Sequence, residues 1–352
     1  MTPVLRSIWG NRASISITAV AATAATAALV LPAATVPASA ASLRTVRLQT
    51  VHLQSAAQTA SATGATSAAQ AASAASVQAA WAARAATGIR HAPASVPSGI
   101  RAWGAELMAE NTGVRLWSKK LHVRRPIGSI AKVMTALVVL QAGDLDRKIT
   151  VTRAAIRYVR RNGASSAGLI RGDVLTARQL LEAMLVPSGC DAAYLLATAY
   201  GPGRAAFITK MNATAKTLGL GSTRFASFDG MPFPTEYSTY STPANLIRLG
   251  EAAMKYRLFR EIVRQQSYLL HGVRHHHHRY IWTSTNLLLS TYPGTLGIKT
   301  GSTLAAGDCL LFEARRGSRT LIGVVLHANP TDSVYSRFIM AARLLNWGFR
   351  HF

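Results

Sequence analysis

From about residue 98 onward, apolar residues recur with two different periods. Two short alternating runs in RAWGAELMAENTGVRLWSK (101–119) flank an NTG turn and predict a β-hairpin. Between about 150 and 260 the spacing changes to three and four, which predicts a series of amphipathic helices. Strand patterns return in YIWTSTN, GTLGIKTG and GDCLLFEARRGSRTLIGVVLHA, and the last of these contains a second hairpin with the turn RRGSR. The final pattern, SVYSRFIMAARLLNWGF, predicts an amphipathic helix.

Strands therefore stand on both sides of a helical insert. This order predicts an α+β fold (an α/β sandwich) whose sheet is built from both ends of one domain. Within it, Trp282, Trp347 and Phe349 are expected in the core, and Cys309 alternates with apolar residues on a strand and should be buried. Export would permit a bridge between Cys190 and Cys309, but the sequence leaves their pairing open.

The amino terminus has the order of a secretory signal. MTPVLRSIWGNR carries two arginines and precedes a long uncharged apolar stretch, which ends in small residues at Ala40. We expect a signal peptide at 1–40; the alternative is a retained anchor, because 13–31 is about long enough to span a membrane. The Ala-, Ser-, Thr- and Gln-rich segment 41–97 has little large apolar surface to bury and predicts a linker. The catalytic domain is then 98–352, outside the cytoplasm.

The chain is strongly basic, with 39 Lys and Arg against 14 Asp and Glu, a formal charge of +25. Export disfavours nucleic acid as the partner and leaves an anionic wall polymer or a membrane surface. The charge is spread widely, for example over Arg124, Arg125, Arg157, Arg160, Arg161, Arg315, Arg316 and Arg319. His275–His278 lack companions at metal-ligand spacing and are interpreted as a solvated hairpin loop, so neither metal nor cofactor is expected.

A lysine stands in an unexpected place in IGSIAK (127–132). It opens the apolar run VMTALVVL, which predicts a helix buried on all sides. Ser129 and Lys132, three positions apart, lie on one face of that helix. Burial disfavours a charged amine, and a neutral amine beside a hydroxyl is a base beside a nucleophile. The helix start at Gly128 and Ser129 also favours developing negative charge.

Two further motifs follow in order. LEAMLVPSGCDAAYLL places Ser188 in a loop between two helices, and GTLGIKTGST places Lys299, Thr300 and Gly301 on a strand that leads into a turn. Each motif alone is weak. Together they resemble the SxxK, SxN and KTG motifs of the low-molecular-mass penicillin-binding proteins, the serine D-alanyl-D-alanine peptidase family. The resemblance covers about 98–352 and implies a β-lactamase/transpeptidase-like fold: an antiparallel sheet flanked by helices, with an inserted helical subdomain beside the active site.

The resemblance implies catalytic roles for three residues. Ser129 attacks the carbonyl between the two D-alanines of a peptidoglycan stem peptide, and Lys132 accepts its proton. Ser188 relays a proton to the departing D-alanine. β-Lactams are then covalent inhibitors of Ser129.

Substrate-binding roles are carried over in the same way to the strand motif. Lys299 and Thr300 face the free carboxylate of the substrate. Backbone NH groups of Ser129 and Ser302 form the oxyanion hole. Gly301 keeps the strand edge open to the substrate backbone. Asn286, in STN, is a further candidate for positioning the substrate.

One position departs from the family pattern, because Cys190 stands where SxN has an asparagine. A thiol is a weak hydrogen-bonding partner, so the substitution is either a tolerated variant, as in some actinomycete members, or it impairs turnover and leaves a polycationic wall-binding protein. Carboxypeptidase and transpeptidase are not distinguished. A β-lactamase is disfavoured, because 195–235 contains no glutamate, and Asp229, its one carboxylate, precedes Gly230 as a turn residue.

Overall fold

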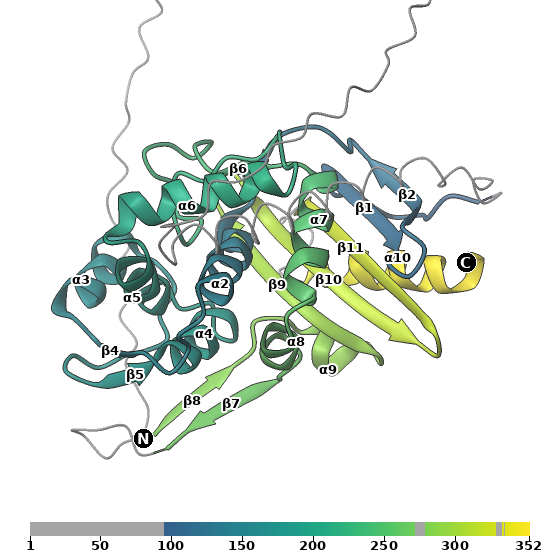
Figure 1. Ribbon diagram of the computed structural model, residues 1–352. Coiled ribbons are helices and arrows are strands. Elements are labelled where there is room, and N and C mark those ends of the chain that lie inside the picture. Colours follow the sequence, from purple (N-terminus) through teal and green to yellow (C-terminus); the bar gives the residue numbers. More distant parts are fainter. Residues whose placement is uncertain (1–94, 272–278, 329–332, 334) are drawn as a thin grey trace, which may run out of the picture. The chain divides into compact units, whose positions relative to one another are not determined.

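The computed structural model describes residues 95–271, 279–328, 333 and 335–352. Its main sheet is antiparallel and has the strand order β2-β1-β11-β10-β9 (Figure 1). The strands are β1 (Gly104–Ala109), β2 (Val114–Lys119), β9 (Thr295–Thr303), β10 (Gly307–Arg316) and β11 (Arg319–Ala328). The sheet from both ends of the domain and both predicted hairpins are thereby confirmed. β9 and β2 are its two edge strands.

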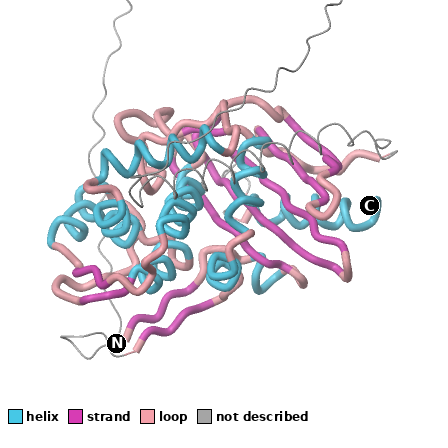
Figure 2. Tube along the Cα trace, in the orientation of Figure 1, coloured by secondary structure: helices cyan, strands magenta, loops and turns pink. Residues whose placement is uncertain are grey.

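The helices of the described residues, shown in Figure 2, lie where the apolar patterns predicted them, except the short α9, which the sequence analysis did not predict. They are α2 (Ala131–Ala142), α3 (Arg153–Asn162), α4 (Ala177–Leu185), α5 (Cys190–Tyr200), α6 (Arg204–Thr217), α7 (Pro243–Met254), α8 (Arg257–Val263), α9 (Leu288–Thr291) and α10 (Ser336–His351). Threonines cap α3, α4 and α7, because each side chain accepts a hydrogen bond from an amide of the first turn.

Three short strand pairs lie outside the main sheet. They are β3 (Arg125–Pro126) with β6 (Tyr240–Ser241), β4 (Lys148–Thr150) with β5 (Val174–Thr176), and β7 (Ser267–Leu270) with β8 (Tyr280–Thr283). The strand predicted in YIWTSTN is thus real, but it pairs with β7 and not with the main sheet.

The alternation in β11 divides the core into two layers. Ile322, Val324 and Leu326 belong to a cluster with α2, α4 and α7, whereas Leu321 and Val325 belong to a second cluster with α10. α7 and α10 therefore cover opposite faces of the sheet (Figure 1).

The residues expected in the core are buried: Cys309, Trp282, Trp347 and Phe349. Cys190 and Cys309 are both free thiols, so the bridge that export would permit is not formed.

Several sequence predictions fall outside the described residues. These are the signal peptide at 1–40, nearly all of the linker at 41–97, and His275–His278. Within the part of the chain that the structure describes, no helix combines the length and apolarity needed to cross a membrane. The same residues include no group of three His, Cys, Asp or Glu side chains that could hold a metal ion.

Glu313 on β10 provides a prediction about stability. Burial and the nearby carboxylates of Glu110 and Glu251 raise the pKa of Glu313 to about 8, against an ordinary value of 4.5. The folded state therefore keeps a proton that the unfolded state loses, and stability should fall as the pH rises from about 4.5 to about 8. Glu313→Gln should remove this loss, so that the variant is more stable than the wild type by roughly 3–5 kcal/mol at pH 9 and nearly equal to it at pH 5.

Urea unfolding at both pH values measures this difference. Glu261→Gln is the control, because that carboxylate lies on the exposed surface and pairs with Arg257. A constant difference between Glu313→Gln and the wild type at pH 5 and pH 9 would contradict the prediction.

Candidate active site

The predicted nucleophile lies at the start of the apolar helix. A 3₁₀ turn, η1 (Gly128–Ile130), leads directly into α2, whose residues Ala131–Val139 are all buried. Ser129 is half-buried, whereas the Lys132 side chain is fully buried, with Nζ 2.7 Å from Ser129 Oγ. The sequence prediction of an amine held beside a hydroxyl is therefore confirmed as geometry.

Three other segments converge on the Lys132 amine. Its Nζ lies 3.5 Å from Ser188 Oγ, 3.2 Å from Cys190 Sγ and 3.1 Å from the main-chain oxygen of Asp229. All three neighbours are neutral, and no carboxylate of the described residues forms an ion pair with Lys132. The polar contacts of the amine within the described residues are therefore hydrogen bonds to neutral groups.

Ser188 lies in the loop between α4 and α5, as predicted, with a left-handed φ of 68°. Non-glycine residues rarely adopt this conformation, so neighbours must hold it in place. Ser165 does so: its Oγ donates to the Ser188 carbonyl at 2.6 Å, and its own carbonyl accepts from the Cys190 amide at 2.8 Å. The sequence analysis missed Ser165, which no motif marks.

Asp191 holds the Ser165 segment against this loop. Its buried carboxylate accepts from Ser166 Oγ at 2.7 Å and from the amides of Ala167 (2.9 Å) and Leu169 (3.3 Å). This residue was also missed, although an acidic side chain directly after the second motif is a signal that could have indicated it.

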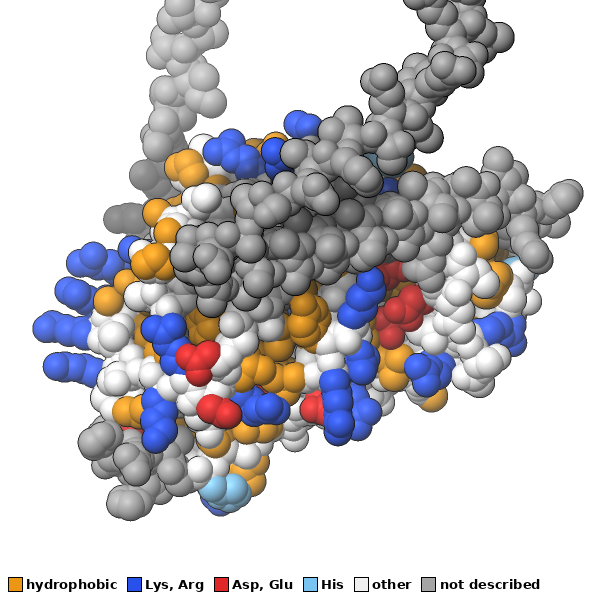
Figure 3. Space-filling view, in the orientation of Figure 1, with side chains coloured by type: hydrophobic (Ala, Val, Ile, Leu, Met, Phe, Trp, Pro, Cys, Tyr) orange, Lys and Arg blue, Asp and Glu red, His pale blue; other side chains and the backbone are white. Residues whose placement is uncertain are grey.

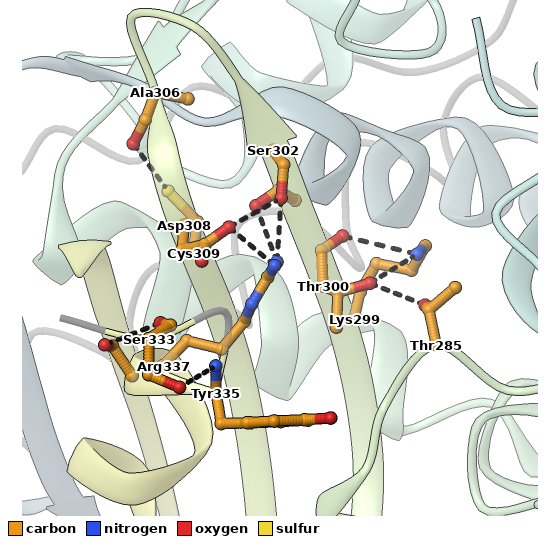
Figure 4. Close-up of polar contacts among 12 residues, drawn as sticks. Thr285, Lys299, Thr300, Ser302, Ala306, Asp308, Cys309, Ser333, Tyr335 and Arg337 are labelled. Carbon is orange, nitrogen blue, oxygen red and sulfur yellow. Dashed lines mark hydrogen bonds and ion pairs between the residues drawn. The ribbon is translucent and has the colours of Figure 1, made fainter. Parts of the chain in front are cut away.

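The third motif forms the edge strand β9 beside this cluster. Lys299 is buried, and its Nζ lies 3.3 Å from Thr300 Oγ1, which in turn lies 2.6 Å from Thr285 Oγ1 (Figure 4). Burial, with the positive charge of Arg337 nearby, holds the pKa of Lys299 well below its usual value. An anion bound here would supply the missing counter-charge.

Glycines allow β9 to approach the nucleophile closely. A Cβ on Gly128 would lie 2.8 Å from the Ser302 nitrogen, and a Cβ on Gly301 would lie 3.1 Å from the Ser129 nitrogen and 2.4 Å from the Ile127 oxygen. The structure adds a role for Gly301 that the sequence analysis did not give it, because its missing side chain makes room for the helix start. Both predicted oxyanion-hole nitrogens border this narrow contact.

Arg337 on α10 is a site residue that the sequence analysis missed. It donates to Ser302 Oγ at 2.8 Å and lies 2.5 Å from Asp308 Oδ1, and Ser302 Oγ contacts the same carboxylate oxygen at 3.0 Å (Figure 4). Its Nε is buried without a hydrogen-bond partner among the described residues. Besides Lys299, Arg337 is therefore a second basic residue beside β9, and it lies near Ser302, which directly follows the KTG motif.

Sequence comparison identifies the family. The sequence profile described as D-alanyl-D-alanine carboxypeptidase, Peptidase S11, matches residues 90–330. The chain belongs to this peptidase family. A D-alanyl-D-alanine carboxypeptidase of Streptomyces sp. (strain K15) is 42% identical over 273 residues, which cover 74% of this chain and 92% of the relative. DacB2 of Mycobacterium tuberculosis, a carboxypeptidase of the same family, is 32% identical over 68% of this chain and 79% of its own length.

Solved structures of the family agree with the fold. The crystal structure of the Streptomyces K15 DD-transpeptidase, 42% identical, matches with a TM-score of 0.68 over 73% of this chain and all of its own. These relationships confirm the resemblance stated from the motifs, and with it the penicillin-binding fold with an antiparallel sheet and flanking helices. Relatives from strain K15 carry both names, carboxypeptidase and transpeptidase.

The structure also shows the surroundings of Asn286 and Asp229, two residues that the sequence analysis discussed. Asn286 is buried, with its Oδ1 accepting from the Leu288 amide and its Nδ2 without a hydrogen-bond partner among the described residues. Asp229 is the expected turn residue, with Oδ1 accepting from the Met231 amide, but its Oδ2 also accepts from the Tyr158 hydroxyl at 2.7 Å. Its carboxylate is therefore engaged away from Ser129. Glu236, just beyond the segment considered, accepts from the Ala305 amide in the β9–β10 turn.

Proposed function

We propose that this peptidase is exported and cleaves D-alanyl-D-alanine ends of peptidoglycan stem peptides through an acyl-enzyme on Ser129. The observation that carries the proposal is the fully buried Lys132 amine 2.7 Å from Ser129 Oγ, with only neutral neighbours. In its neutral form this amine accepts the serine proton as Oγ attacks the carbonyl carbon. The C–N bond then breaks, and the acyl group stays on Ser129.

The negative charge that develops on the substrate carbonyl oxygen during the attack is stabilised by hydrogen-bond donors that are already positioned around it. The Ser129 and Ser302 amides border the contact between the helix start and β9, which the glycines keep narrow. A donor of this kind commonly contributes about 3–4 kcal/mol to the transition state. Ser188, 3.5 Å from Nζ, lies where it can pass the proton from Lys132 to the leaving amine.

The free carboxylate of the substrate has a suitable subsite on β9. Lys299 and Thr300 supply a cation and a hydroxyl, and Arg337 adds a second cation beside Ser302. Because the pKa of Lys299 is lowered in the free protein, the carboxylate should restore the lysine proton on binding. Substrate binding is then linked to proton uptake.

The acyl acceptor separates the two remaining activities. We favour water, hence a carboxypeptidase; the alternative is a D,D-transpeptidase that uses an amine, a possibility kept open by the two names of the strain K15 relatives. The test is incubation with an N-acylated tripeptide ending in D-Ala-D-Ala, with and without glycylglycine. Free D-alanine with only the shortened peptide supports hydrolysis, a glycylglycine adduct supports transfer, and no D-alanine release contradicts both.

Replacing Cys190 by asparagine should retain or raise the rate of D-alanine release. Asparagine both donates and accepts hydrogen bonds, so it can contact Lys132 Nζ, now 3.2 Å from Cys190 Sγ, better than a thiol does. We expect a change from none to about tenfold faster, corresponding to one improved hydrogen bond. Cys309→Ser, at a buried thiol outside the site, is the control. Complete loss of activity in Cys190→Asn would show that the thiol is required.

We also propose that the basic charge of the protein retains it at the cell wall. In the alternative of a catalytically impaired wall-binding protein, this retention is the only function. The excess of 39 basic over 14 acidic side chains suits attraction to an anionic polymer or membrane surface. Salt at about 1 M shortens the screening length to roughly 3 Å and should release the protein from cell walls. Failure of molar salt to release any of it would exclude an electrostatic attachment.

A further inference from the structure

A cavity of about 690 Å³ lies in the helical subdomain, outside the group of motif residues. Its walls come from α3, α5, α6 and the loop 226–233. The residues that matter here are Arg157 and Arg161 on α3, Tyr194 on α5, Arg204 on α6, and Phe228 and Phe233 in the loop. The mechanism proposed above uses none of them.

The cavity concentrates positive charge. Arg157, Arg161 and Arg204 line it, no acidic residue does, and no carboxylate of the described residues forms an ion pair with these three. The sequence RAAIRYVRRN of α3 carries four arginines and no acid, and Figure 3 shows basic side chains gathered at the edge where Figure 1 places α3. Part of the basic charge that looked evenly spread along the sequence is therefore concentrated around this cavity.

Aromatic rings form the inner wall. The ring centroids of Tyr158 and Tyr194 lie 5.4 Å apart, as do those of Tyr158 and Phe228, and Phe233 is 40% exposed. The Arg204 guanidinium lies 4.6 Å from the centre of the Tyr194 ring. Guanidinium groups match the geometry of phosphate oxygens, and aromatic faces offer an apolar surface to a sugar or polyol carbon chain.

We propose that this cavity is a second binding site, which takes phosphate groups of a sugar- or polyol-phosphate polymer. Three exposed arginines without carboxylate partners attract a polyanionic ligand, and the aromatic wall offers apolar surface to the carbon chain beside its phosphates. A flexible polymer can insert single phosphates into a recessed cavity, whereas the headgroups of a bilayer lie in one plane. That the polymer comes from the cell wall rests on the proposed function, whereas the anion-binding site itself is inferred independently of it.

The cavity is connected to the active site through two residues. The Tyr158 hydroxyl donates to Asp229 Oδ2 at 2.7 Å, and the main-chain oxygen of Asp229 accepts from Lys132 Nζ at 3.1 Å. A ligand that displaces Tyr158 therefore moves the turn that positions the catalytic amine. Occupancy of the cavity should change the rate at which Ser129 is acylated.

The first test is calorimetric titration of the full-length protein with inorganic pyrophosphate at constant ionic strength. Arg157→Gln/Arg161→Gln removes two charges that line the cavity; Arg153→Gln/Arg160→Gln removes two from the same helix that do not. We expect saturable binding that is at least about tenfold weaker in the first pair and within about twofold of wild type in the second. Equal weakening in both pairs, or no saturable binding to the wild type, would overturn the proposal.

The second test separates the two sources of phosphate. Poly(glycerol phosphate) should bind with the same dependence on the Arg157/Arg161 pair, whereas binding to phosphatidylglycerol vesicles should not depend on it. The reverse result would replace the polymer by a membrane. Because Ser129→Ala should bind poly(glycerol phosphate) as well as the wild type does, a failure of the peptidase proposal would leave this result unchanged.

The connection to Lys132 is measured separately. Saturating poly(glycerol phosphate) should change the rate at which benzylpenicillin acylates the wild type by at least about twofold. The acylation rate of Tyr158→Phe, which lacks the hydroxyl, should not change. An equal change in both proteins would show that the effect does not pass through Tyr158.

Discussion

Replacing Ser129 by alanine should abolish the covalent adduct between the protein and benzylpenicillin. In the wild type we expect a stable mass increase of one penicilloyl group, because Ser129 Oγ is accessible and its proton acceptor lies 2.7 Å away. Removing a serine nucleophile typically lowers turnover by about a million-fold. No adduct should therefore be detectable in Ser129→Ala after hours of incubation. Intact-protein mass spectrometry, followed by peptide mapping, measures both proteins.

The stability of the adduct tests a second feature of the site. Asp229 is engaged with Tyr158, so the segment 195–235 offers no free carboxylate to activate water. Penicillin should therefore behave as an inhibitor and not as a substrate. Ser302→Ala, a change outside the acylating pair, is the control and should still form the adduct. An unmodified wild type with intact antibiotic would favour the wall-binding protein over the enzyme, and rapid hydrolysis would favour a β-lactamase.

The sequence predicted those parts of the fold that depend on local patterns. Period-two alternation identified β1, β2, β10 and β11, and the run after Lys132 predicted a helix buried on all sides, which α2 is. The order of Ser129, Ser188 and Lys299 was sufficient to recognise the family. The residues that flank each of them predict its local structure, which is a helix start, a loop and a strand in turn.

The residues that the sequence analysis missed act through contacts between distant segments. Arg337 reaches Ser302 from α10, and Ser165 holds Ser188 from a loop 23 positions earlier. No periodicity or spacing marks such pairs, because they exist only after the sheet and the subdomain have packed. Gly301 illustrates the same limit: its sequence context indicates an open strand edge, and only the packed structure shows that the helix start also lies against this glycine.

Lys132→Met should separate the stability of the protein from its chemistry. Methionine has nearly the shape of the lysine side chain but no amine, so it fits a helix whose neighbouring residues are all buried and apolar or small. It forfeits the contacts of Nζ with Ser188, Cys190 and Asp229 but also removes a buried amine without a counter-charge. We expect these effects to offset each other to within about 1–2 kcal/mol.

Acylation should respond very differently, because no other described side chain near Ser129 can accept its proton as readily. The loss of a general base predicts a fall of about 10²–10⁴-fold in the rate of reaction with benzylpenicillin. Lys132→Arg is the informative comparison: guanidinium keeps a positive charge but does not deprotonate in proteins. If Lys132 acts as a base, arginine should be as inactive as methionine and less stable, because a permanent charge is then forced into an apolar helix. Substantial acylation in Lys132→Arg would instead mean that the site needs a positive charge beside Ser129, and the proton would have to leave by another group.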